Sequence, residues 1–192
     1  KAVDTRTKKD VHNALSISMS VDSQIYSFGQ FMAPANQAGY GHDIYNKILE
    51  MIFIQPDMRL KDSTCSLRLP YDYLDSKETY LHMLKLFESH ASKLPFKLIF
   101  EMPDKLISQE SETITQYKEL FEKYGFEMAV FEFIGESHDY KYLQDLRPAY
   151  IKGEVDYYLN QSEQSLSALR LITDSVGISL IATGAMNMET WE

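Results

Sequence analysis

The sequence predicts an α/β fold in which a parallel sheet is covered by helices, because apolar residues alternate between two spacings along the whole chain. Ile44, Ile48 and Met51 recur at helical spacing, whereas Cys65 and Leu67 alternate as they would in a strand. The remaining expected strands are Lys97–Phe100, Met128–Phe133, Tyr150–Lys152 and Ile178–Ala182, and the remaining expected helices span residues 80–87, 114–124 and 166–176. Strand and helix in regular succession are typical of βα units.

The length of 192 residues corresponds to one domain, since domains run to about 100–200 residues. No Pro-, Gly- or Ser-rich linker divides the chain. Gly125 and Gly177 follow two of the expected helices and are suitable C-terminal caps. Two architectures remain open: an open doubly wound sheet, or a β/α barrel. A complete barrel of eight units usually needs about 200–250 residues, so a barrel here would lack its last unit.

The composition excludes several classes of function. Nineteen basic and 28 acidic residues give a net charge of −9, and a chain this acidic is a poor direct binder of nucleic acid. No apolar stretch approaches the roughly 18 residues of a membrane span. The single cysteine, Cys65, excludes an intrachain disulfide framework and a multi-cysteine zinc site. A reducing, cytoplasmic compartment is expected.

Few residues stand out as generic catalytic or binding groups. The five histidines are scattered and expected at the surface: His12, His42, His82, His90 and His138. Cys65 is expected in the core, because it lies in an apolar strand. Tyr71, Tyr73 and Tyr80 are expected to pack at a strand-to-helix junction, with stacking on a base as the alternative.

Carboxylates follow several of the expected strands, where a β/α barrel has its chemistry. Glu101 and Glu132 lie at or near the ends of two strands, and Glu154 follows a third just after Lys152. A ring of this kind is able to hold one or two divalent metals. The alternative is a set of separate, solvated loop carboxylates, and composition alone favours it.

Ordered segments along nearly the whole chain resemble the EAL domain, the cyclic-di-GMP phosphodiesterase fold. They are His12–Leu15, Phe31–Gly39, Phe100–Asp104, Ala129–Phe133 with Tyr142-Leu143 and Tyr150–Lys152, and Ile181–Met186. The resemblance implies an EAL-type (β/α) TIM-like barrel that is incomplete at its C-terminus. It also implies that the first strand, assigned to Ala14–Met19, runs antiparallel to the others. Because the sequence begins at Lys1 without Met, we expect residues 1–192 to be a single EAL-like domain within a longer multidomain protein.

The positions that hold two metal ions in active members of the family are mostly replaced. The resemblance places eight residues of this chain in a vestigial pocket: Asn13, Arg68, Glu101, Phe131, Glu132, Lys152, Thr183 and Met186. Glu101 and Lys152 are its clear survivors, whereas Phe131 and Met186 offer no oxygen and Arg68 would repel a cation. We therefore expect no catalytic residue, no metal ligand and no cofactor, and a degenerate phosphodiesterase that is not an enzyme.

The resemblance then implies a non-catalytic regulatory domain in a bacterial signalling protein, acting through protein–protein contacts as CsrD-type and MshH-type regulators do. The expected partner is a protein, and the candidate is the glucose-specific phosphotransfer protein. A membrane anchor elsewhere in the parent protein is compatible with this expectation. The alternative is a LapD-type receptor that binds cyclic-di-GMP without hydrolysing it. Against this alternative, Ile17 stands where that type has a phosphate-contacting arginine, although Arg68 offers a replacement charge.

Overall fold

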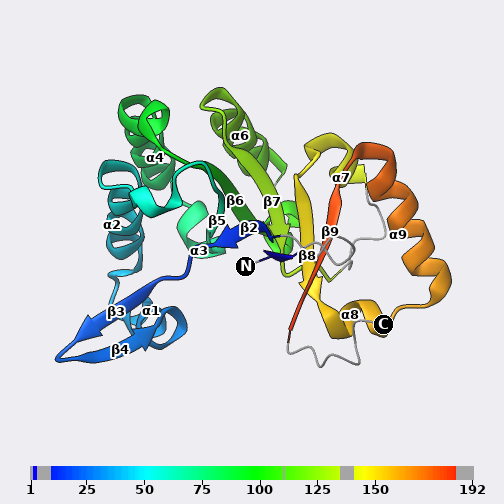
Figure 1. Ribbon diagram of the computed structural model, residues 1–192, viewed down its shortest axis with the longest axis horizontal. Coiled ribbons are helices and arrows are strands. Elements are labelled where there is room, and N and C mark those ends of the chain that lie inside the picture. Colours follow the sequence, from blue (N-terminus) through cyan, green and yellow to red (C-terminus); the bar gives the residue numbers. More distant parts are fainter. Residues whose placement is uncertain (1, 4–9, 110, 135–140, 185–192) are drawn as a thin grey trace.

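The computed structural model describes residues 2–3, 10–109, 111–134 and 141–184. It shows a seven-stranded sheet in the order β1-β2-β5-β6-β7-β8-β9, with helices on its outer side (Figure 1). β1 (Ala2–Val3) pairs with β2 antiparallel, and the other neighbouring pairs are parallel. The six parallel strands are β2 (Asp10–Ala14), β5 (Thr64–Arg68), β6 (Lys97–Pro103), β7 (Glu127–Phe131), β8 (Tyr150–Glu154) and β9 (Ser179–Thr183).

Helices connect the parallel strands, as crossover connections require. The longer ones are α1 (Phe28–Gln37), α2 (Gly41–Ile54), α4 (Lys77–His90), α6 (Ser111–Lys123) and α9 (Glu163–Val176). The shorter ones are α3 (Tyr71–Leu74), α5 (Asp104–Gln109), α7 (Lys141–Leu146) and α8 (Val155–Leu159), with 3₁₀ turns η1 (Met58–Leu60) and η2 (Ala91–Lys93). Local signals set several ends: Ser162 caps α9 by accepting from the Ser165 N–H at 3.1 Å, and Gly177 ends it at a φ of 76°.

Aromatic side chains fill the space between the sheet and the outer helices. Phe100 of β6 stacks on Phe121 of α6 with ring centroids 4.5 Å apart, and Phe87 of α4 meets Phe126 at 4.8 Å. These rings are at most 7% exposed. Aromatic side chains each bury a large apolar area, so this cluster contributes strongly to the packing of the helices on the sheet. Cys65 lies in the same core, as predicted, and is fully buried.

The sheet curls far enough to bring its distant strands together on the inner side. His12 of β2 stacks on Tyr150 of β8, with ring centroids 4.9 Å apart and planes within 8° of parallel. Ile99, Ala129 and Tyr150 form a separate small cluster on that inner side. A curled sheet of six parallel strands with an open side is an incomplete β/α barrel, which confirms the expected fold. The expected parallel neighbours Tyr150–Lys152 and Ile178–Ala182 are confirmed as β8 and β9.

The expectation for Ala14–Met19 is wrong. The first parallel strand comes earlier in the chain, at Asp10–Ala14, and it pairs with β5. The chain then leaves the sheet and forms a separate hairpin from β3 (Ser18–Val21) and β4 (Gln24–Ser27). Asp22 and Ser23 have φ values of 48° and 67°, which suit the tight turn between these strands.

Tyrosine packing at the β5–α3 junction matches the prediction. Tyr73 is 2% exposed and its ring lies 4.8 Å from that of Tyr45, while Tyr80 meets Tyr117 edge-on at 5.6 Å. Within the described residues, no helix has the length and apolar character needed to cross a membrane.

Candidate functional site

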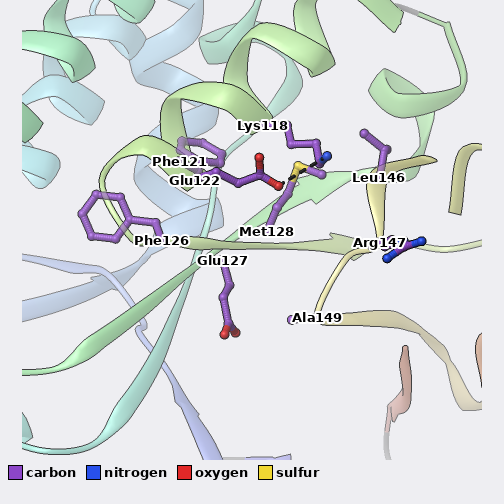
Figure 2. Close-up of a pocket in the computed structure, with 9 residues that line it drawn as sticks. All are labelled: Lys118, Phe121, Glu122, Phe126, Glu127, Met128, Leu146, Arg147 and Ala149. Atoms are coloured by element: carbon purple, nitrogen blue, oxygen red, sulfur yellow. Dashed lines mark ion pairs between the residues drawn. The ribbon is translucent and has the colours of Figure 1, made fainter. Parts of the chain in front are cut away.

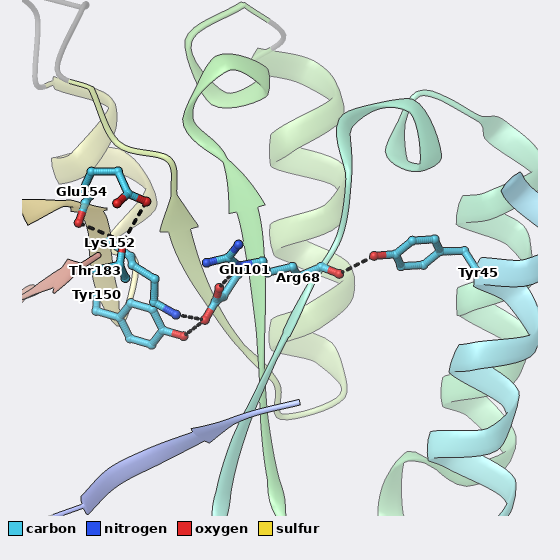
Figure 3. A network of polar contacts seen from close by, with 8 residues as sticks. Tyr45, Arg68, Glu101, Tyr150, Lys152, Glu154 and Thr183 are labelled. Carbon is cyan, nitrogen blue, oxygen red and sulfur yellow. Dashed lines mark hydrogen bonds and ion pairs between the residues drawn. The ribbon is translucent and has the colours of Figure 1, made fainter. Parts of the chain in front are cut away.

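The carboxyl ends of the parallel strands carry a polar cluster centred on Glu101 of β6 (Figure 3). Glu101 is fully buried, and its Oε1 accepts hydrogen bonds from the Tyr150 hydroxyl at 2.6 Å and from the Lys152 ammonium. Tyr150 and Lys152 are two residues apart in β8, so strand alternation points both side chains to the inner face. The carboxylate is therefore neutralised by a buried cation from two strands away.

Arg68, at the end of β5, makes the third contact with this carboxylate. Its Nε lies 3.3 Å from Glu101 Oε2, and its guanidinium stands 5.1 Å above the ring of Phe131. The Arg68 carbonyl accepts from the Tyr45 hydroxyl at 3.0 Å, which ties the strand end to α2. The Arg68 side chain is still 56% exposed. Its guanidinium is thus held in place while a large part of it faces solvent at the mouth.

Burial and the neighbouring donors act in opposite directions on Glu101. Burial acts to raise the pKa of Glu101, but the hydrogen bonds from Lys152 and Tyr150 and the charge of Lys152 outweigh it and lower that pKa. Burial, followed by the Glu101 charge, raises the pKa of Tyr150. Both shifts favour an ionised Glu101 carboxylate and a protonated Tyr150 phenol, which lie beside the basic side chains of Lys152 and Arg68.

His12 and Ser66 lie beneath this cluster. His12 is 3% exposed, and neither of its ring nitrogens has a hydrogen-bond partner among the described residues; the Ser66 hydroxyl also lacks a well-formed bond there. Burial, followed by the charge of Lys152, lowers the pKa of His12, so the ring is neutral at pH 7. The expectation that His12 lies at the surface is wrong, because stacking on Tyr150 buries it inside the curled sheet.

Four of the residues assigned to the vestigial pocket come together: Arg68, Glu101, Phe131 and Lys152. Glu132 follows Phe131 with a φ of 54°, an uncommon conformation for a residue other than glycine, and its side chain is exposed. Thr183 lies further along the mouth, where its hydroxyl donates to Glu154 Oε1 at 3.1 Å.

Asn13 is not part of this cluster. It is in register with Cys65, which faces the helices, whereas the next residue, Ala14, is in register with Ser66. Because successive strand residues point to opposite faces, Asn13 points away from Glu101. Met186 lies outside the described residues.

These donors do not suit the divalent metals of the family. Glu101 already shares its oxygens with Lys152, Tyr150 and Arg68, and Phe131 has no oxygen to offer. Two cations within hydrogen-bonding reach of Glu101 would repel Mg²⁺ or Ca²⁺, which need several hard oxygen ligands. Among the described residues, no group of three or more His, Cys, Asp or Glu side chains is placed to hold a metal ion.

Sequence reasoning missed Tyr150 and His12 as members of the cluster. The spacing of two residues between Tyr150 and Lys152 was an available signal for the tyrosine, since it places both on one strand face. For His12 no local signal exists, because its partner is 138 positions away and meets it only through the curvature of the sheet.

A cavity of about 420 Å³ opens at the opposite end of the sheet from the Glu101 cluster (Figure 2). It lies beside the amino end of β7, between α6 and the residues that precede β8, and Lys118 and Glu122 form an ion pair of 3.3 Å at its edge. β/α barrels carry their chemistry at the carboxyl ends of the strands, so the Glu101 cluster is the better candidate site.

The fold is an incomplete β/α barrel, and the candidate site is a buried polar cluster at the carboxyl ends of its strands. The model of the EAL domain matches residues 3–192, so the chain belongs to the EAL family of cyclic-di-GMP signalling domains. A search of curated protein sequences returned no match.

Solved structures share the fold at low sequence identity. A Vibrio cholerae LapD S helix-GGDEF-EAL structure, bound to c-di-GMP, is 17% identical with a TM-score of 0.82; the match covers 98% of this chain and 47% of that one. The chain thus spans about half the length of the LapD structure. A PaMucR phosphodiesterase in a c-di-GMP complex is 16% identical (TM-score 0.67, 87% and 76% covered). The Bacillus subtilis YkuI protein, with c-di-GMP and calcium, is 20% identical (TM-score 0.60, 90% and 44% covered).

Proposed function

We propose that this EAL domain binds cyclic-di-GMP at the carboxyl ends of its strands and does not hydrolyse it. One observation carries the proposal: Glu101 is saturated by Lys152, Tyr150 and Arg68, while the Arg68 guanidinium is still 56% exposed at the mouth. The cluster therefore repels a metal cation and attracts an anion. A phosphodiester is the anion that the family's ligand would present.

Binding without hydrolysis follows from the same side chains. Metal-dependent hydrolysis of a phosphodiester needs cations to activate a water and to stabilise the leaving oxygen. Arg68 and Lys152 supply positive charge for binding a phosphate, but neither activates water as a metal does. The degenerate, non-enzymatic character expected from the sequence is part of this proposal, as is the receptor role that the sequence left as the alternative.

The LapD structure supports the receptor candidate, because its match covers nearly the whole of this chain and that protein was solved with c-di-GMP bound. A protein-interaction regulator that has lost the nucleotide is the second candidate. It is favoured by Ile17, a half-buried apolar residue packed against the core at the position where the receptor type has its arginine.

Titration of the protein with cyclic-di-GMP by calorimetry separates the candidates. We expect binding in a chelator, unchanged by added Mg²⁺ or Ca²⁺, and no linear dinucleotide on chromatography after long incubation. No binding with or without metal would contradict the receptor proposal and favour the protein-interaction candidate. Linear product that requires the added metal would instead show an active phosphodiesterase.

A further inference from the structure

The cavity beside the amino end of β7 has the size and the walls of a small-molecule site (Figure 2). Its volume is about 420 Å³, within the range of about 300–1,000 Å³ that such sites usually have. Five of its nine lining residues are apolar, and three of these, Phe121, Phe126 and Met128, are at most 7% exposed. The cavity therefore offers an apolar wall, and covering that wall with a second apolar surface is favourable in water.

The charged residues around this cavity leave one cation in excess. Lys118 and Glu122 of α6 form an ion pair of 3.3 Å, so they neutralise each other. Glu127 also lines the cavity, but the next residue, Met128, packs in the core beneath the helices, so strand alternation turns the Glu127 side chain to the other face. Figure 2 shows the Glu127 side chain pointing away from Lys118 and Glu122. The remaining charge belongs to Arg147, which is exposed and has no acidic partner among the described residues.

The backbone of Arg147 is strained. Its φ is 46°, in the left-handed region that glycine and asparagine tolerate best. Its N–H donates to the Leu143 carbonyl at 3.0 Å and ends α7, at a position where helices commonly have glycine. Glycine would make the same backbone contact without strain, so the turn does not require an arginine. What the arginine adds is a guanidinium at the edge of the cavity, and strain of this kind clusters at functional sites.

We propose that this cavity binds a small organic anion, a carboxylate with an apolar body. The carboxylate pairs with Arg147, whose planar guanidinium suits two parallel hydrogen bonds to it. The apolar body covers Phe121, Phe126 and Met128 and is removed from water. An inorganic anion would leave this wall uncovered, and an apolar ammonium ion would meet Arg147 with a like charge. The inference does not depend on the proposed function, because the cavity lies at the opposite end of the sheet from the Glu101 cluster.

Methyl NMR of the protein labelled at its methionines observes the cavity directly. The probe is octanoate, and octylammonium is the matched probe because it has the same apolar chain with the opposite charge. The spectra of Met128→Leu and Met58→Leu identify the two methyl signals; Met58, in η1 and 63% exposed, is the control signal. We expect octanoate to shift the Met128 signal saturably and to leave the Met58 signal unchanged, and octylammonium to bind at least about tenfold more weakly.

Two arginine variants test the anion contact. Arg147→Asn removes the charge and keeps a residue that tolerates the positive φ, so the fold should be retained, which thermal melting checks. Arg170→Asn is the matched control, because Arg170 is an exposed arginine of α9 and the change in net charge is the same. We expect octanoate to bind about tenfold more weakly to Arg147→Asn and equally well to Arg170→Asn. A Met128 signal that does not respond to about 10 mM octanoate would overturn the proposal, as would equal affinity for octylammonium or an affinity that Arg147→Asn leaves unchanged.

Discussion

Replacement of Arg68 is the sharpest perturbation of the proposed nucleotide site. The guanidinium is fixed by Glu101 at 3.3 Å and by the Phe131 ring at 5.1 Å, and 56% of the side chain remains exposed. A hydrogen bond to a charged group is worth about 1.5–3 kcal/mol. Because this site is open to solvent, the lower end applies, and Arg68→Ala should weaken cyclic-di-GMP binding about tenfold.

Calorimetry in a chelator measures this loss directly. Arg59→Ala is the matched control: Arg59 also pairs with a carboxylate, Asp57, but it lies in η1, before the amino end of β5. Arg68→Lys should recover only part of the affinity, since a lysine does not form the bidentate contact with a phosphate. Equal affinity in Arg68→Ala and the original chain would refute the reasoning, because another group would then be the main phosphate contact.

Three further predictions concern stability and pH. Lys152→Met should lower the free energy of unfolding by about 3 kcal/mol in urea denaturation, because it leaves the buried Glu101 carboxylate without its cation. Adding Glu101→Gln should restore part of this loss, because the double variant has no buried charge at that position. Losses that simply add in the double variant would contradict the pairing. The pKa of His12 is lowered from 6.5 in the folded state, so the unfolded chain binds more protons as the pH decreases below 6.5, and the free energy of unfolding decreases with it. His12→Phe should reduce this pH dependence by up to about 1.4 kcal/mol per pH unit, measured by urea denaturation at several pH values. An unchanged pH dependence would assign it to other groups. Gly153→Ala should destabilise the fold by about 1–3 kcal/mol, because a Cβ there would lie 2.8 Å from the Phe133 carbonyl oxygen. Gly29→Ala is the control, because a Cβ at Gly29 would have open space around it. Equal melting temperatures for the two variants would contradict the steric clash at Gly153.

Most of the fold could be predicted because its signals are local. The helical spacing that ends at Gly125 and the alternation in Cys65 and Leu67 each act within one element, and α6 and β5 form there. The hairpin could not be predicted in the same way. Serine and apolar residues alternate from Ser16 to Val21 without a break, so the sequence does not show where the chain leaves the sheet. Its turn, Asp22-Ser23, lacks the glycine that marks most tight hairpins.

The sequence indicated only those residues of the candidate site that strand spacing or the resemblance to the family identifies. Glu101 and Lys152 were expected together, and the structure pairs them. The stack of His12 on Tyr150 depends on how far the sheet curls, which no local pattern encodes. Asn13 was assigned to the pocket by the resemblance, but its register with Cys65 turns it to the other face.

The presence of Arg68 and Phe131 is explained better by their contact with each other than by two independent substitutions. At the positions that the resemblance assigns to the family's metal site, an arginine alone would compete with the metal, and a phenylalanine alone would leave a gap among the ligands. Together, the ring supports the guanidinium from below, and Glu101 fixes it from the side. An aspartate in place of Phe131 would give the guanidinium a second carboxylate partner and cancel its remaining charge. Restoring that one acidic residue should therefore weaken the attraction for a phosphate without rebuilding a metal site, because Lys152 would still occupy Glu101.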